Sequence, residues 1–180
     1  MSPAAALLWP CGEPEAERHG AGLPTGWSIA IGFDAEYWLG VHTGLDINLP
    51  GQADYGKPCY AVADGVVTSA GAQRGTWGNV ILIRHPSVPG LGTVWSQYAH
   101  LSAVDVAAGA IVTQGQRIGA LGNGATNGHG PTVSAHLHFE LRRTDLAPGR
   151  WPSGTGKSQS AAVHQFIRAN YLDPLGLLGT

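Results

Sequence analysis

The chain has 180 residues, of which 43% are hydrophobic and 12% are charged, and its formal net charge is −2. This length suits one domain with its own hydrophobic core, and the low fraction of charged residues excludes a typical disordered chain. The sequence lacks the basic excess that favours nucleic acid as a partner, and no apolar stretch is long enough to span a membrane.

The first 24 residues are predicted to form an irregular lead-in, followed by a single domain over residues 25–180. The lead-in holds a short apolar run, residues 4–9, with no charged residue before it, so no export signal is visible. Its Cys11 and the more distant Cys59 could form one disulfide, but the spacing alone leaves this pairing open.

The middle of the chain is predicted to be a mainly β, antiparallel fold. Short apolar runs alternate with turn residues, and no helical period separates them. The predicted strands are residues 28–33, 44–48, 59–63, 65–70, 79–84, 93–98, 117–121 and 136–141. The pair Asp64-Gly65 predicts a hairpin between two of these strands.

The last forty residues are predicted to contain a loop, a short helix and a tail. Proline and glycine mark residues 143–156 as a loop. Ser158 or Ser160 could cap a helix that runs to about Asn170. The apolar tail over residues 171–178 is expected to dock on the sheet.

Two groups of polar residues could bind a metal ion. If residues 42–48 are extended, His42 and Asp46 share one face, while Thr43 and Leu45 share the other. In the same way His136 and His138 share a face, opposite an apolar face. Mixed imidazole and carboxylate donors suit catalytic zinc, which takes three protein ligands. There are four candidates for three places, so spacing does not select the ligands, and a cupin-like metal site also fits.

A third histidine, His100, ends a predicted strand and could face the same cleft. His129 lies in a glycine-rich loop, residues 122–130, that lacks the lysine and helix start of a phosphate-binding loop. We therefore expect a loop at the edge of the cleft rather than a nucleotide site.

The sequence resembles the lysostaphin/LytM-like zinc metallopeptidases, which are peptidoglycan endopeptidases. The resemblance covers roughly residues 41–141, and its motifs occur in the order of the family. They are residues 42–46, 61–67, 78–85, 98–102, 112–119 and 136–140.

The resemblance implies the family's duplicated-hybrid-motif-like antiparallel β fold with a short C-terminal helix. It assigns His42, Asp46 and His138 as ligands of Zn²⁺, and His100 and His136 as catalytic residues. The implied activity is hydrolysis of peptide crosslinks or bridges in bacterial peptidoglycan through a metal-activated water. The site of action would be the cell wall or periplasm, reached by phage-type release, by another secretion route, or in a longer form of the chain.

Two other functions fit parts of the sequence. A non-catalytic member of the family could regulate or bind wall enzymes, although such members have lost ligands that are all present here. A lipoyl-like carrier would need a lysine at a hairpin tip, and none lies between residues 61–65 and 112–116. Apparent insertions at residues 50–57, 87–92, 132–135 and 143–156 would line the groove, so the cleaved bond does not follow from the resemblance. The sequence also leaves the oligomeric state undetermined.

Overall fold

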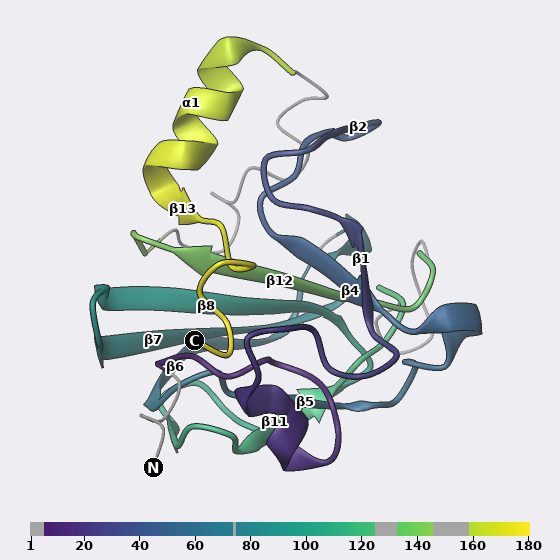
Figure 1. The fold of residues 1–180 in the computed structure, drawn as a ribbon, viewed down its shortest axis with the longest axis vertical. Coiled ribbons are helices and arrows are strands. Elements are labelled where there is room, and N and C mark those ends of the chain that lie inside the picture. Colours follow the sequence, from purple (N-terminus) through teal and green to yellow (C-terminus); the bar gives the residue numbers. More distant parts are fainter. Residues whose placement is uncertain (1–5, 74, 125–132, 146–158) are drawn as a thin grey trace.

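The computed structural model describes residues 6–73, 75–124, 133–145 and 159–180. Most of the strands form one large, antiparallel β-sheet, from which helix α1 and strand β2 project at one end (Figure 1). The strand order is β1-β4-β12-β8-β7-β6-β10, with β13 paired to β12. These strands are β1 Ser28–Ile31, β4 Leu45–Asn48, β6 Gly65–Ala72, β7 Asn79–Val88, β8 Gly92–Leu101, β10 Ile111–Val112, β12 Leu137–Arg142 and β13 Tyr171–Leu172.

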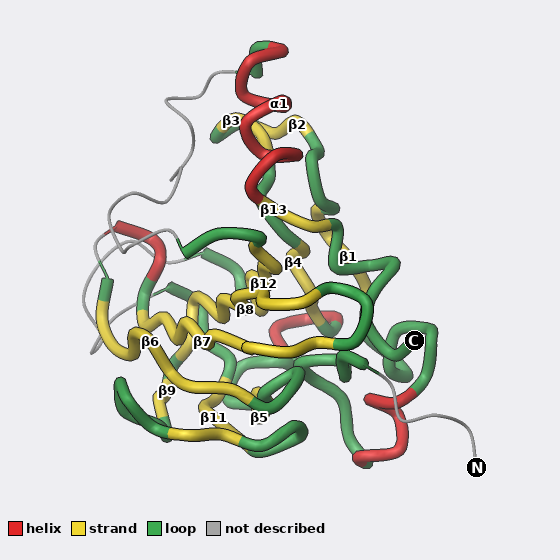
Figure 2. Tube along the Cα trace, turned by 90° about the vertical axis from the view of Figure 1, so that its left-hand side faces the viewer, coloured by secondary structure: helices red, strands yellow, loops and turns green. Residues whose placement is uncertain are grey.

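Two smaller sheets complete the fold. A three-stranded sheet with the order β5-β11-β9 lies below the main sheet in Figure 2, and a two-stranded hairpin pairs β2 with β3. The remaining elements are β2 Glu36–Tyr37, β3 Gly40–Val41, β5 Pro58–Tyr60, β9 Ala103–Val104, β11 Arg117–Ala120, α1 Ala161–Asn170 and the 3₁₀ helices η1 Glu15–His19, η2 Pro50–Gln52 and η3 Gly75–Trp77. The predicted mainly β fold with a short C-terminal helix is confirmed.

The core lies between the main sheet and the smaller three-stranded sheet. Alternate residues of the central strands fill it, as the period of an extended chain requires. Leu137, Phe139 and Leu141 of β12 belong to this core, together with residues of β4, β7 and β8. The opposite face of β12 is also buried, because all six of its residues are shielded from solvent. Polar side chains on that face must therefore find partners within the protein.

The predicted hairpin at Asp64-Gly65 is wrong. β5 pairs with β11 in the small sheet, whereas β6 pairs with β7 and β10 in the main sheet, so the chain crosses between sheets at this point. Gly65 is needed for close packing, because a Cβ atom there would lie 2.6 Å from the carbonyl oxygen of Arg84. Gly65 therefore allows close packing where the chain passes from the small sheet to the main sheet, and it does not form a hairpin turn.

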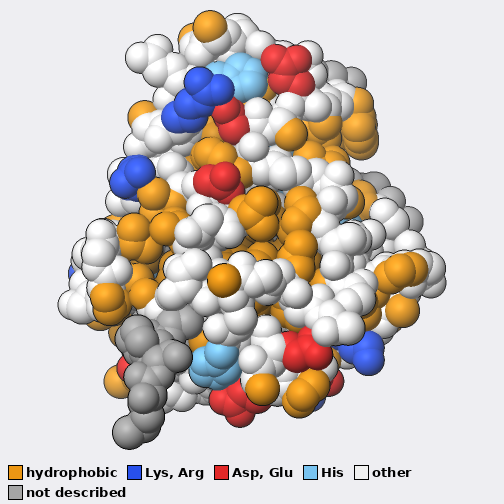
Figure 3. Space-filling view, in the orientation of Figure 1, with side chains coloured by type: hydrophobic (Ala, Val, Ile, Leu, Met, Phe, Trp, Pro, Cys, Tyr) orange, Lys and Arg blue, Asp and Glu red, His pale blue; other side chains and the backbone are white. Residues whose placement is uncertain are grey.

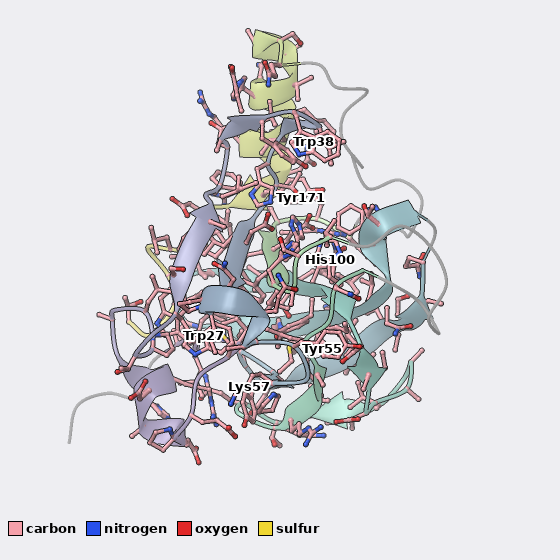
Figure 4. The ribbon with its side chains drawn as sticks, turned by 90° about the vertical axis from the view of Figure 1, so that its right-hand side faces the viewer. Trp27, Trp38, Tyr55, Lys57, His100 and Tyr171 are labelled. Carbon is pink, nitrogen blue, oxygen red and sulfur yellow. The ribbon has the colours of Figure 1, made fainter. Side chains whose placement is uncertain are left out.

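The described part of the lead-in packs against the domain. Leu8 N donates to Val62 O and Tyr60 N donates to Pro10 O, each at 2.9 Å, and Trp9 is fully buried. In Figure 4 this segment, ending near Trp27 and Lys57, lies on the side of the molecule away from His100. Cys11 and Cys59 are both buried and both free thiols.

The C-terminal segment follows the prediction closely. Ser160 occupies the N-cap position of α1, but its side chain makes no capping hydrogen bond. Ser158 and most of the predicted 143–156 loop lie outside the described residues. The tail docks through β13, which pairs with β12 at Leu141 and Arg142. Among the described residues, no helix combines the length and apolar character needed to cross a bilayer.

Helix α1 is fastened to the turn that precedes β2. His164 Nδ1 lies 2.7 Å from Asp34 Oδ1, its Nε2 lies 3.2 Å from Glu36 Oε1, and Arg168 Nε donates to Asp34 Oδ2 at 2.6 Å. Figure 3 shows this mixed cluster of basic, histidine and acidic side chains at the upper end of the molecule. Asp34 N in turn donates to His42 O at 2.9 Å, so the helix braces the backbone of a predicted metal ligand.

We predict that this contact depends on pH through His164. Hydrogen bonds to Asp34 and Glu36 raise the pKa of His164 above its ordinary value. The stabilisation is therefore complete below the pKa of an unfolded histidine, about 6.5, and is lost as the pH rises through the raised value. His164→Ala should lower the melting temperature by about 1–3 °C at pH 5.5 and by less at pH 9.

The matched control is Arg168→Ala, which removes a cation of fixed charge from the same aspartate. Its effect on the melting temperature should be similar at both pH values, because arginine does not titrate in this range. A His164→Ala effect that stays constant with pH would contradict the assignment. Thermal unfolding followed by circular dichroism measures both variants.

Candidate metal centre

Three predicted ligands meet on the polar face of the main sheet. Asp46 of β4 lies directly opposite His138 of β12 in the antiparallel ladder, and His42 comes from the connection after β3. The Asp46 Oδ1 atom lies 3.0 Å from His42 Nε2 and 2.9 Å from His138 Nδ1, and these two nitrogens lie 3.1 Å apart. The three side chains are buried.

The hydrogen bonds of the two imidazoles show which nitrogens face inward without a hydrogen. His42 Nδ1 lies 3.0 Å from Gly32 O, an oxygen that can only accept, so this nitrogen carries the hydrogen. His138 Nε2 lies 2.9 Å from Glu140 Oε1, which also accepts. In the neutral rings, two nitrogen lone pairs and a carboxylate oxygen therefore converge, and this arrangement requires a cation.

The triangle of donor atoms fits zinc. Tetrahedral zinc binds nitrogen and carboxylate oxygen at about 2.0–2.2 Å, which separates neighbouring ligand atoms by about 3.3 Å. The observed separations of 2.9–3.1 Å are close to this value. Three protein donors would leave a fourth position for a reactant, as in catalytic rather than structural zinc sites.

Without a metal, a proton takes the place of the cation. Burial alone would lower the pKa of His138, but hydrogen bonds to Asp46 and Glu140 outweigh it and raise the pKa to about 9. Burial would raise the pKa of Asp46, yet the hydrogen bonds with His138 and His42 hold it well below its ordinary value. The centre is thus built to keep a positive charge beside an ionised carboxylate.

The other two predicted site residues lie beside this cluster. The rings of His100 and His136 are 4.5 Å apart between centroids, and His136 Nε2 lies 3.6 Å from Asp46 Oδ1. His100 comes from the end of β8, and His136 immediately precedes β12. His129, in contrast, lies outside the described residues. The structure therefore brings all five residues of the predicted site into one cluster.

The strict alternation predicted for residues 42–48 is wrong at its start. The strand begins only at Leu45, and Thr43 points to the polar side, where its hydroxyl donates to Glu140 Oε1. Gly44 makes this path possible, because a Cβ atom there would lie 2.1 Å from Phe139 O. The chain can bring both His42 and Asp46 to the centre because residue 44 has no side chain.

The sequence prediction missed the residues that surround the cluster. Tyr37 meets His42 edge-on with ring centroids 5.3 Å apart, and Trp77 stacks on His100 at 6.1 Å. No periodic pattern marks either aromatic residue, since both lie in very short elements. Glu140 could have been found, because it continues the alternation His136, His138 along β12.

Comparisons with known proteins identify relatives in sequence and in fold. Residues 40–149, more than half of the chain, match the family described as Peptidase family M23. The chain is 40% identical over 102 residues to the DD-carboxypeptidase/endopeptidase Mpg of Neisseria gonorrhoeae, covering 57% of this chain and 20% of that protein. It is 34% identical over 121 residues to the peptidoglycan DD-endopeptidase ShyA of Vibrio cholerae, covering 64% and 25%. The chain thus spans a quarter or less of these relatives.

Two solved structures share the fold. The catalytic domain of lysostaphin from Staphylococcus simulans superposes with a TM-score of 0.60 at 22% identity, covering 86% of this chain and 93% of that one. A zinc-containing peptidase from Vibrio cholerae superposes with a TM-score of 0.51 at 25% identity, covering 74% and 37%.

The β fold defines the class of lysostaphin-like folds, and its cluster of two imidazoles and one carboxylate could hold a metal ion. Within that class, the match over residues 40–149 is decisive, and the chain belongs to peptidase family M23. The resemblance stated from the sequence motifs is confirmed.

We expect His138→Ala and Asp46→Asn to lose most bound zinc. Each change removes one of three donors, and neither alanine nor an uncharged amide replaces it. Zinc content per folded chain, measured by mass spectrometry of the metal after dialysis, checks this. His19→Ala, which removes an exposed histidine of the lead-in, should keep the zinc content of the parent. Full zinc in His138→Ala would show that the ligand set is different.

Proposed function

We propose that the chain is a zinc-dependent endopeptidase that hydrolyses peptide crosslinks or bridges of bacterial peptidoglycan. The single observation that carries the proposal is the convergence of two more histidines, His100 and His136, on the three metal donors. A site that only held a metal would need the donors alone. The endopeptidase names of the relatives Mpg and ShyA support the substrate class.

His100 and His136 each have one ring nitrogen hydrogen-bonded to a backbone carbonyl oxygen. His100 Nδ1 donates to Thr76 O at 2.7 Å, and His136 Nδ1 donates to Ser134 O at 2.7 Å. Because a carbonyl oxygen only accepts, each ring keeps its hydrogen on Nδ1 and offers the Nε2 lone pair. Two nitrogens able to accept a proton therefore lie beside the donor cluster.

His100 is held as a neutral ring in an uncommon backbone conformation. Burial, with His136 and His138 close by, lowers the pKa of His100 to about 3, so the ring is neutral at physiological pH. Its backbone has a φ of +64°, a conformation that costs a residue other than glycine about 1–3 kcal/mol. The fold thus maintains a strained position that directs this ring toward the centre.

The five polar side chains have different roles in the proposed hydrolysis. His100 or His136 accepts a proton from the attacking water through Nε2, and an imidazole returns a proton to the leaving amine. Asp46, His42 and His138 would hold the zinc ion, which when bound polarises a carbonyl and makes water a stronger nucleophile. Tyr37 and Trp77 flank the cluster, so an extended peptide would lie between aromatic side chains.

We predict that His100→Ala keeps bound zinc but loses about 10²- to 10⁴-fold of its turnover, the usual contribution of a positioned acid or base. The measurement is digestion of purified peptidoglycan of two crosslink types, with mass analysis of the released fragments. His19→Ala, an exposed histidine of the lead-in, is the matched control and should release fragments at the parent rate.

Two outcomes would contradict the proposal. A parent protein that binds zinc but releases no fragment from either peptidoglycan would indicate a non-catalytic member of the family. Unchanged turnover in His100→Ala would remove this histidine from the reaction. The identity of the fragments also shows whether a glycine bridge or a D-amino-acid crosslink is cut.

A further inference from the structure

The polar face of β12 carries a continuous row of functional groups. Alternation along the strand places His136, His138, Glu140 and Arg142 on the same side. The last three are at most 5% exposed, and Arg142 is fully buried. The row therefore runs from the metal centre into the interior of the protein. Glu140 and Arg142, at the inner end of the row, have no part in the ligand assignment or in the proposed reaction.

Glu140 divides its two oxygens between the metal centre and the interior. Oε1 accepts from His138 Nε2 at 2.9 Å and from the Thr43 hydroxyl. Oε2 accepts from Arg142 Nε at 2.9 Å and Nη2 at 2.8 Å. Arg142 also donates to Gln97 Oε1 of β8, and its guanidinium lies 5.6 Å from the centre of the Tyr171 ring.

Burial explains why the two charged residues occur together. An isolated carboxylate would be very costly at this depth, and a guanidinium that donates to one of its oxygens offsets that cost. The pairing leaves the second oxygen ionised and oriented toward His138. A carboxylate there can only accept, so it keeps the hydrogen of the His138 ring on Nε2. The lone pair of Nδ1 is then directed at Asp46 and His42.

We propose that Glu140, held by Arg142, is the positioning residue of the metal centre, fixing the ring orientation and tautomer of His138 for metal binding. The inference rests on the proposed zinc function and deepens it. Glu140 is not one of the three converging donors and would act through His138. Carboxylates that accept the second N–H of a metal-bound histidine commonly alter metal affinity about 10- to 100-fold.

Glu140→Gln tests the inference sharply because the two side chains have the same shape. A carboxylate offers two accepting oxygens, whereas an amide offers one oxygen and one donating NH₂ group. The two N–H donors of Arg142 should hydrogen-bond to the amide oxygen of the substituted glutamine, which turns its NH₂ group toward His138 Nε2. That ring then has to accept at Nε2 and carry its hydrogen on Nδ1, the nitrogen needed for the metal.

The experiment measures zinc affinity by competition with a chelator, on the full chain and at a temperature where each variant is folded. Glu140→Gln should weaken zinc binding about 10- to 100-fold. Thr43→Val, which removes only the hydroxyl donor to Oε1, should weaken it several-fold. The control Glu13→Gln changes an exposed carboxylate that accepts from the Tyr60 hydroxyl at 2.7 Å, and it should leave affinity unchanged.

A purely structural role gives a different result. If Glu140 only neutralises Arg142, Glu140→Gln lowers the melting temperature of the metal-free protein but binds zinc within about twofold of the parent, which overturns the inference. The absorption spectrum of the cobalt-substituted protein supplies a second readout. Its d–d bands should shift in Glu140→Gln and stay unchanged in Glu13→Gln. If Glu140→Gln does not fold, unchanged zinc affinity in Thr43→Val overturns the inference.

The inference and the proposed function can fail separately. A parent chain that binds zinc without cleaving peptidoglycan overturns the enzyme proposal, while a loss of zinc affinity in Glu140→Gln still supports the role of Glu140. A parent chain that binds no zinc overturns both.

Discussion

The antiparallel register of β4 against β12 is the constraint on which the site depends. It sets Asp46 directly opposite His138, although the two residues are 92 positions apart in the chain. Side chains directly opposite each other on one face of a ladder have Cβ atoms about 4.5–5.5 Å apart, so a carboxylate and an imidazole placed there must meet. A slip of one residue would turn His138 into the core and Leu137 or Phe139 to the polar face. The same apolar residues that bury the sheet therefore fix the geometry of the metal donors.

A second consequence of this register is a set of charges inside the protein. Asp46, Glu140 and Arg142 are all largely buried, and each is close to a group of opposite charge or to an imidazole. Buried charges cost free energy unless they are paired, so removing one charged residue destabilises the protein by leaving its partner buried and unpaired. The row along β12 thus links the histidine cluster to the interior, where Glu140 and Arg142 neutralise each other.

Much of this arrangement follows from sequence patterns, and the exceptions have physical causes. Alternation of polar and apolar residues identified the long strands and the two faces of β12, because a half-polar strand has a period of two. Alternation failed at Thr43, because the strand begins only at Leu45 and Gly44 lets the chain before it take another path. The turn signal Asp64-Gly65 failed because this glycine is required by close packing and not by a turn. The hairpin of β2 and β3 has strands of only two residues, which are too short to show a period.

The choice between His136 and His138 as ligand illustrates the limit of spacing. Both share a face and a residue type, so the pattern treats them alike, and only the resemblance to a family separated them. In the structure they differ in their partners. His138 is paired across to Asp46 within the strand ladder and fixed from behind by Glu140, whereas His136 precedes the strand and bonds its own loop at Ser134. Under the proposed function, a strand centre suits a ligand whose donor atom must stay in place, and a strand end suits a ring that exchanges protons. His100 follows the same rule at the end of β8, where a left-handed backbone conformation turns it toward the centre.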